Sequence, residues 1–158
     1  MINIQQASLD TFQARWTGDK SAGEQFHTHL KNNTAEYWVA KKDNEIIGQA
    51  YFFTHLNDPD CANGKHRAYI ANLYVLPHGR GQGIATQLME RIFARLVERG
   101  FSHATIGVSE AEIKNVQLYE RLGFVHKIKQ CHADPICTDT NGQPIAMDPF
   151  LLISKDLR

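Results

Sequence analysis

Three glycines and one arginine lie directly before a helix-like segment, and together they could bind an anion. Gly79, Gly81 and Gly83 alternate with Arg80 and Gln82 after an apolar run. A helix that begins near Gly83 leaves its first N–H groups without partners inside the helix, and the helix dipole makes that end positive. Glycine lets an anion approach the backbone, and arginine can pair with phosphate oxygens. The stretch therefore predicts a phosphate site.

The spacing of the glycines bears on three alternative roles. A turn that only joins a strand to a helix needs no ligand, and the glycines alone do not distinguish it from a binding loop. The dinucleotide fingerprint G-x-G-x-x-G/A fails, because its last position falls on Ile84 or on Thr86. A Walker loop needs a G-K-[ST] sequence, and the stretch has no such lysine.

The pattern of apolar residues predicts an α/β chain that positions this stretch between a strand and a helix. Residues 9–31 are helix-like and are expected to break at Gly18 and Gly23 into two short helices. An Asn141-Gly142 pair indicates a hairpin turn near the end of the chain. Strands are expected at 36–42, 45–56, 67–76, 102–109, 124–131 and 149–157, with helices from Ile84 to the Gly100 stop and from a Ser109/Glu112 capping box to Leu122.

Two segments resemble one known family. V-L-P-H-G-R-G-Q-G-I-A (75–85) is similar to the acyl-CoA-binding signature of the GNAT superfamily of N-acetyltransferases, [Q/R]-x-x-G-x-[G/A] after a strand ending in V-x-P. L-Y-E-R-L-G-F (118–124) resembles the later L-Y-E-x-x-G-F motif of that family. The segments lie in the family's order, separated by a helix and a strand. The positions that match the first signature are Val75, Pro77, Arg80, Gly83 and Ala85.

The resemblance implies one domain over residues 1–158 with an α/β (α+β) fold. Its mixed, mostly antiparallel sheet would be flanked by helices and would open in a V where strand 67–76 meets strand 102–109. Acetyl-CoA would lie in this opening, and a backbone N–H of the strand would polarise its thioester carbonyl. The pantetheine would pair with the backbone of Leu73 and Val75, beside Tyr74. The pyrophosphate would contact Arg80 and the N–H groups of Gly81, Gln82, Gly83, Ile84, Ala85 and Thr86.

The resemblance also implies the catalytic groups. An amine with a pKa of about 10.4 needs about 4.6 kcal/mol to be neutral at pH 7, so a base, a water chain or an apolar pocket must supply it. Many family members place a carboxylate before the L-x-V strand, whereas this chain has Ala71 and Asn72. We therefore expect a water relay that Asn72 orients. Tyr119 occupies the family's general-acid position and would protonate the leaving thiolate.

One further contact to the pantetheine is expected on the later helix. The family often has asparagine seven residues before the tyrosine, but Glu112 stands there and fits the capping box better. Asn115 lies one helical turn before Tyr119, on the same face, and could contact the pantetheine instead.

Composition restricts the class of protein. The chain has 158 residues, 42% hydrophobic and 22% charged, with 17 basic and 17 acidic side chains. This balance lacks the positive charge of a protein that binds nucleic acid or an anionic membrane. We expect no signal peptide, no membrane span and, from three cysteines without CxxC spacing, reduced thiols in the cytoplasm. Eight histidines show no spacing typical of a metal site, so no metal is expected.

The motifs do not identify the amine that accepts the acetyl group. Between Gln130 and Ser154 there are three acids, Asp134, Asp139 and Asp148, and no Lys or Arg. They could attract a cationic amine, although turns also favour Asp for local reasons. The expected function is acetyl transfer to a primary amine of a small molecule, peptide N-terminus or lysine, by a monomer or homodimer. The alternative is a non-catalytic acyl-CoA-binding sensor.

Overall fold

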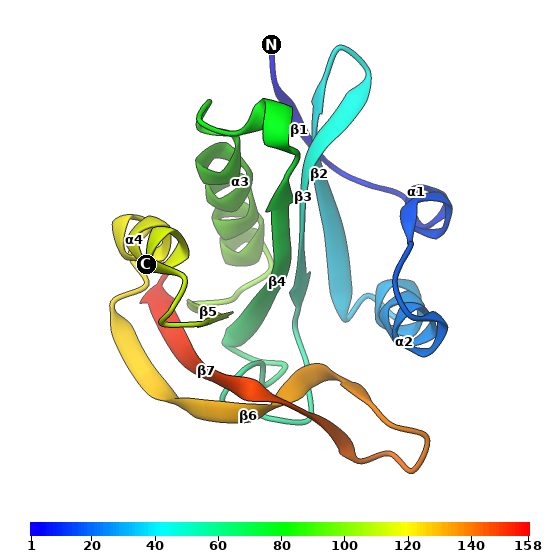
Figure 1. Cartoon of the computed structure of the whole chain (residues 1–158), viewed down its shortest axis with the longest axis vertical. Coiled ribbons are helices and arrows are strands. Elements are labelled where there is room, and N and C mark those ends of the chain that lie inside the picture. The colour runs from blue at the N-terminus through cyan, green and yellow to red at the C-terminus, as the bar shows by residue number, and fades with distance from the viewer.

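The computed structural model describes all residues from 1 to 158, and its elements form one continuous sheet with helices on both faces (Figure 1). In chain order these are β1 (Asn3–Gln6), α1 (Leu9–Arg15), α2 (Lys20–Lys31), β2 (Ala35–Lys42), β3 (Glu45–Phe53), β4 (Arg67–Val75), the 3₁₀ turn η1 (Pro77–Gly79), α3 (Ile84–Glu98), β5 (His103–Val108), α4 (Ile113–Arg121), β6 (His126–Thr138) and β7 (Pro144–Asp156).

The sheet has the order β1-β2-β3-β4-β5-β7-β6, and only β4 and β5 are parallel. Their pairing begins at Arg67 with His103 and ends at Ile70 with Ile106. Beyond that point β5 continues against β7, while β4 continues against β3 alone. The expected mixed, mostly antiparallel sheet with a V-shaped opening between these two strands is therefore confirmed.

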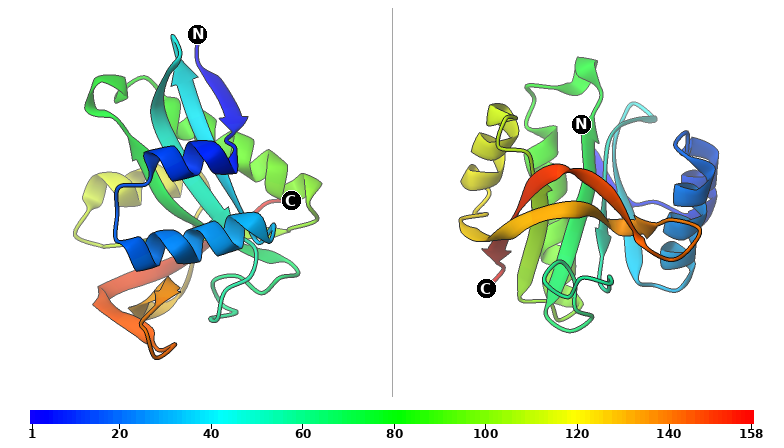
Figure 2. Two further views of the ribbon diagram at one scale, coloured as in Figure 1. Left: turned by 90° about the vertical axis from the view of Figure 1, so that its right-hand side faces the viewer. Right: turned by 60° about the horizontal axis from the view of Figure 1, so that its bottom comes forward.

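Two apolar layers hold the helices on opposite faces of the sheet (Figures 1 and 2). The spacing of Ala85, Leu88, Met89, Ile92 and Leu96 in the sequence predicts one apolar face on α3. Ala85 is half-buried, the other four are fully buried against the sheet, and α4 completes this layer. The other layer joins α1 and α2 to the opposite face through aromatic side chains of β2 and β3. Burial of this apolar area is the main stabilising contribution to the fold.

Several local expectations are wrong, each for a physical reason. Gly23 does not end a helix but lies inside α2, where a Cβ would approach Trp16 Nε1 to 2.5 Å. The Trp16 indole packs across this glycine and donates to the Asp19 carbonyl at 3.0 Å. The Ser109/Glu112 capping box is also wrong, because α4 begins at Ile113 and the Glu112 side chain caps no backbone N–H.

The edge strands also differ from the expectation. The sequence does not predict β1, because it is short and lacks apolar alternation; its backbone pairs with β2 from Asn3 opposite Lys41 to Gln6 opposite Trp38. β6 and β7 extend beyond the expected strands, because the hairpin pairing continues to Thr138 opposite Pro144, through residues of β7 whose side chains are exposed. The Asn141-Gly142 turn is confirmed at the hairpin tip.

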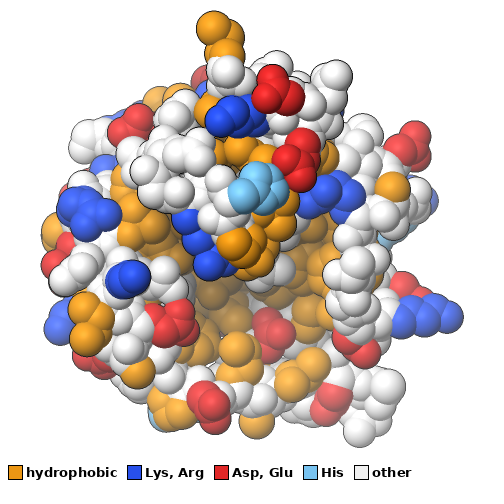
Figure 3. Space-filling view, turned by 45° about the horizontal axis from the view of Figure 1, so that its top comes forward, with side chains coloured by type: hydrophobic (Ala, Val, Ile, Leu, Met, Phe, Trp, Pro, Cys, Tyr) orange, Lys and Arg blue, Asp and Glu red, His pale blue; other side chains and the backbone are white.

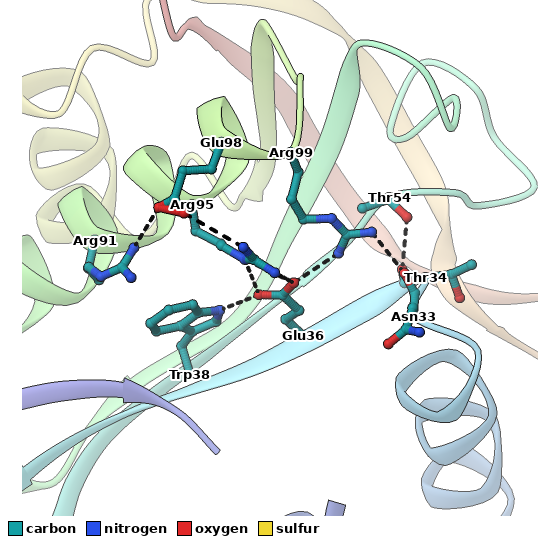
Figure 4. Close-up of polar contacts among 9 residues, drawn as sticks. All are labelled: Asn33, Thr34, Glu36, Trp38, Thr54, Arg91, Arg95, Glu98 and Arg99. Carbon is teal, nitrogen blue, oxygen red and sulfur yellow. Dashed lines mark hydrogen bonds and ion pairs between the residues drawn. The ribbon is translucent and has the colours of Figure 1, made fainter. Parts of the chain in front are cut away.

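A buried carboxylate links the end of α3 to β2 (Figure 4). Glu36 is 5% exposed and accepts hydrogen bonds from Arg95 Nε at 3.0 Å and from Arg99 at 3.0 Å. Trp38 Nε1 donates to the same carboxylate, and Arg99 also donates to the Asn33 carbonyl. The network fixes the C-terminal end of α3 on the sheet, and therefore the direction in which its N-terminus points.

No helix of this fold combines the length and the apolar character that crossing a bilayer requires.

Candidate active site

A cavity of about 760 Å³ opens where β4 and β5 separate. Its walls come from β4, β5, α4 with the residues before it, α2 with the link from α1, and the β6–β7 hairpin. The space-filling view shows a deep hollow between the two flanks of the molecule, with mostly hydrophobic side chains inside it (Figure 3). A cavity with apolar walls and few polar groups is typical of a ligand site.

A β-bulge in β4 lies at this cavity. The register changes between Tyr51 opposite Ala71 and Gln49 opposite Tyr74, which leaves Asn72 and Leu73 as the bulge. Asn72 has a φ of 55°, a left-handed conformation that asparagine tolerates better than most residues. Bulges redirect side chains and end strand pairing, and here the bulge follows the last residue that pairs with β5. The edge of β4 after the bulge is therefore available to an extended ligand.

Arg80 lies along this exposed edge. Its Nε donates to the Val75 carbonyl at 2.9 Å, and its guanidinium lies 5.4 Å from the centre of the Tyr74 ring. The terminal guanidinium nitrogens have no hydrogen-bond partner within the chain. Arg80 thus presents its charge beside the strand where the sequence predicts the pantetheine.

The glycines before α3 have different roles. Gly81 and Gly83 have φ values of 78° and 75°, and a Cβ on either would meet no atom within 4 Å. Gly83 is the N-cap of α3, and no side chain caps the helix there, so no capping side chain uses its first N–H groups. Gly79 is buried, and a Cβ on it would lie 3.3 Å from Val75 Cγ1. Two glycines therefore open the backbone to an anion, and the third allows close packing.

Tyr119 reaches the cavity from α4 on the other side of the opening. It is 7% exposed, packs edge-on against Phe124, and its hydroxyl has no hydrogen-bond partner within the chain. Burial, and secondarily the charge of Glu112, raises its pKa to about 12. The side chain is therefore a protonated donor at neutral pH, directed toward a cavity shared with the bulge in β4.

The family profile described as Acetyltransferase (GNAT) family matches residues 2–124. This chain belongs to the GNAT family of acetyltransferases. An N-alpha-acetyltransferase MAK3 of Arabidopsis thaliana is 38% identical over 79 residues, which are 46% of this chain and 40% of that protein. N-acetyltransferase 8B of Rattus norvegicus is 25% identical over 97 residues, 61% of this chain and 42% of that protein. The chain thus spans about two fifths of these relatives.

Solved GNAT structures share the fold over the whole chain. A GNAT acetyltransferase from Elizabethkingia anophelis with acetyl-CoA bound has a TM-score of 0.66 at 19% identity and covers 98% of this chain and 97% of its own. The Escherichia coli ribosomal-protein-S18-alanine N-acetyltransferase has a TM-score of 0.70 at 16% identity, covering 99% and 94%. At these identities the likeness concerns the fold, and the expected GNAT fold is confirmed.

Some residues expected to contact acetyl-CoA have other neighbours in this GNAT chain. The Asn115 amide donates to the Glu112 carboxylate, and Asn115 is not part of the cavity wall. The Gln82 side chain bridges the His78 carbonyl and Lys42, and the Ile84 side chain is buried. Gln82 and Ile84 can therefore offer a ligand only their backbone groups without rearrangement, and the role of Asn115 stays a prediction.

The sequence motifs missed part of the cavity wall. Trp16 and Asp19 enter from the link between α1 and α2, and Tyr69 enters from β4, three residues before Asn72. Nothing in their spacing indicated a shared site, because each lies in a different local pattern. The structure holds no group of three or more His, Cys, Asp or Glu side chains placed to bind a metal ion.

Proposed function

We propose that this GNAT protein is an N-acetyltransferase that moves the acetyl group of acetyl-CoA directly to a primary amine. One observation carries the proposal: a single cavity joins β4 at Asn72 and Leu73, where it has left β5, to Tyr119 on α4. The names of the relatives, N-alpha-acetyltransferase and N-acetyltransferase, support it. So does the acetyl-CoA bound to a neighbour of the same fold.

The backbone would hold the acetyl donor. Gly81, Gly83 and the first turn of α3 offer N–H groups to the pyrophosphate, and Arg80 adds a positive charge. The backbone of β4 at Leu73 and the N–H of Val75 would bond the pantetheine, since the Val75 carbonyl already accepts from Arg80. A backbone N–H at this edge would polarise the thioester carbonyl without any particular side chain.

The transfer needs the amine nitrogen to lose two protons and the sulfur to gain one. The ammonium first loses a proton, and the neutral amine attacks the carbonyl carbon. The C–N bond forms, the C–S bond breaks, and the nitrogen releases its second proton to water, from which Tyr119 later regains its own. No carboxylate stands on β4 at the bulge, so a water held by Asn72 would accept the amine proton. Tyr119 would give its proton to the leaving sulfur, and its raised pKa of about 12 keeps that proton in place until the thiolate forms.

The experiment is release of free CoA thiol from acetyl-CoA across a panel of primary amines. We expect thiol release that depends on the amine, and a raised KM for acetyl-CoA in Arg80→Ala. Lys31→Ala, which removes an exposed charge at the end of α2, is the control and should leave that KM unchanged. Tight acetyl-CoA binding without thiol release for any amine would replace the transferase with a non-catalytic acyl-CoA-binding module.

A further inference from the structure

The cavity is strongly one-sided in charge. Four of the side chains that line it are acidic, and none is Lys, Arg or His. The chain as a whole has equal numbers of acidic and basic side chains, so composition does not explain this wall. The acids come from three separate parts of the fold: Asp19 before α2, Glu112 before α4, and Asp134 and Asp148 on the two strands of the β6–β7 hairpin.

Two basic residues in neighbouring hollows serve other contacts. Arg15 lies in an adjacent hollow across Asn72, where its Nε donates to the Tyr37 hydroxyl at 3.0 Å. Lys129 lies in a neighbouring hollow that Asp134 also lines, and it is paired there with Asp58 at 2.8 Å and with Asp60 at 3.0 Å. The carboxylates of the cavity therefore have no counter-ion within the chain.

Local bonds hold two of these carboxylates without using all their oxygens. Asp134 Oδ1 accepts from the N–H groups of Ile136 and Cys137 at 2.8 and 3.2 Å, which leaves Oδ2 free. Asp19 Oδ2 caps α2 by accepting from the Ala22 N–H at 3.0 Å, which leaves Oδ1 free. Asp148 has no hydrogen bond or ion pair within the chain. The turn hydrogen bonds expected from the sequence are present at Asp134, and they also position its carboxylate.

The acids occupy two ends of the cavity. Glu112 lies near Tyr119 at the thioester end, where its charge contributes to the raised pKa of the phenol. At the hairpin end, burial and then the charges of Asp134 and Asp19 raise the pKa of Cys137 to about 11. Gln25 on α2 holds the hairpin end, because its side chain bonds both the N–H and the carbonyl of Thr138. Figure 2 shows the hairpin and α2 side by side.

A largely buried tyrosine whose hydroxyl opens onto the cavity lies between the two ends. Tyr69 is 7% exposed, lines the cavity, and its hydroxyl has no hydrogen-bond partner within the chain. Gly107 faces it from β5, where a Cβ would lie 3.1 Å from that hydroxyl. The aromatic walls beside it, Trp16 and Phe150, are suited to methylene groups and to cations. Because it faces the cavity and has no partner in the chain, this hydroxyl is free to bond a ligand.

We propose that the acceptor is an aliphatic chain with two ammonium groups, one that reacts beside Tyr119 and one that Asp134, Asp19 and Asp148 hold at the hairpin end. This inference rests on the proposed function, because it names the substrate of that same site. The reacting nitrogen must lose its charge, so it cannot satisfy the distal carboxylates. A second ammonium can, and the apolar walls between the ends accommodate the methylenes that join the two nitrogens.

Such a chain has two sources, a free diamine or polyamine and the side chain of a lysine near a free amino terminus. The probes are 1,4-diaminobutane against 1-aminobutane, and a short peptide with lysine at its second position against the same peptide with norleucine. In the parent protein we expect kcat/KM for the dication of one pair to exceed that for its monocation by about tenfold. The pair that shows the preference identifies the source.

The decisive variant is Asp134→Asn/Asp148→Asn, in which asparagine keeps the loop hydrogen bonds of residue 134. We expect it to reduce the preference for the dication by about fivefold to tenfold. Asp139→Asn is the matched control, because Asp139 lies in the same hairpin, makes similar turn bonds and does not line the cavity. It should leave the preference unchanged, and added salt should weaken the preference in the parent.

The outcomes separate this inference from the proposed function. Equal kcat/KM for dication and monocation in both pairs would overturn the inference and leave the transferase intact, as would a double variant that keeps the full preference. If no amine releases CoA, the transferase proposal fails. Calorimetry with 1,4-diaminobutane then decides the inference: binding that the double variant weakens supports the cation site, and absent binding overturns it.

Discussion

Tyr119 shows how the environment fits one side chain to one task. An ordinary phenol already holds its proton at neutral pH, and burial beside Glu112 strengthens that hold by raising the pKa to about 12. The hydroxyl has no partner in the chain, so its hydrogen bond is free for a ligand in the cavity. A thiolate with a pKa of about 8.5 is less basic than the phenolate, so the transfer depends on close contact at the moment the C–S bond breaks.

Replacing the hydroxyl tests this assignment. Tyr119→Phe keeps the ring that packs against Phe124, so we expect it to lower kcat about 10²-fold and to leave acetyl-CoA affinity nearly unchanged. Steady-state thiol release gives kcat, and calorimetry with acetyl-CoA gives the affinity. Turnover within threefold of the parent would end the assignment of Tyr119 as the acid.

The pH profile tests the same group in the unmodified protein. Because the pKa of Tyr119 is raised from 10.0 to about 12, its acid form persists to higher pH than that of an ordinary tyrosine. We expect kcat to keep rising through pH 10.0 as the amine, with a pKa of about 10.4, loses its proton, with no decline centred at pH 10.0. A falling limb with a midpoint near pH 10.0 that Tyr119→Phe removes would show an unperturbed phenol and contradict the prediction.

At the scale of elements, the loop before α3 and the bulge in β4 act together. The bulge turns the edge of β4 toward the opening, and the loop brings the start of α3 beside that edge. Both rely on left-handed backbone, at Asn72 in the strand and at Gly81 and Gly83 in the loop. Asn72 therefore suits its left-handed backbone as well as its proposed role with water. Asn72→Gly keeps that backbone and removes the amide, so its effect on kcat separates the two roles.

A pair of glycine variants separates backbone strain from loss of the anion site. Gly83 and Gly142 share a φ of 75°, and a Cβ on either meets nothing within 4 Å. Alanine at each position should cost about 1–2 kcal/mol of unfolding free energy, because both force an L-residue into the left-handed region. Only Gly83→Ala should also raise the KM for acetyl-CoA, by about tenfold. Equal KM values for the two variants would remove Gly83 from the cofactor site.

At the scale of the whole molecule, the site depends on contacts far from it. α3 is fixed at its C-terminal end by Glu36, Arg95 and Arg99, at the opposite end of the helix from Gly83 (Figure 4). Because a helix is stiff, fixing one end determines where the other end points. The hairpin is fixed in a similar way by the contact between Gln25 and Thr138.

Removing the buried charge tests this anchor. Glu36→Gln keeps the shape of the side chain but loses the charged bonds to Arg95 and Arg99, so we expect a loss of about 1–3 kcal/mol in unfolding free energy. Chemical denaturation measures the loss. Glu98→Gln is the control, since Glu98 forms only longer, more exposed pairs at 3.6 and 3.7 Å and should change stability by less than about 0.5 kcal/mol. Equal losses would contradict the anchoring role.

The sequence by itself determined the local features of this protein. The helical stripe of α3, the glycine loop, the Tyr119 motif and the Asn141-Gly142 turn depend on neighbours within a few residues, and the structure has each of them in the expected element. The GNAT family followed from two such motifs. Local patterns failed at Gly23 and at the capping box, where a tertiary contact with Trp16 and a later helix start prevailed.

Only the tertiary structure decided which residues meet at the cavity. Asp19, Tyr69, Asp134 and Asp148 come from segments more than a hundred residues apart at the extremes, and no spacing relates them. Their meeting depends on the point where β4 leaves β5, on the bulge at Asn72 and on the reach of the hairpin across to α2. These are long-range pairings whose energies come from the assembled sheet. The residue pattern of any one segment therefore does not predict them.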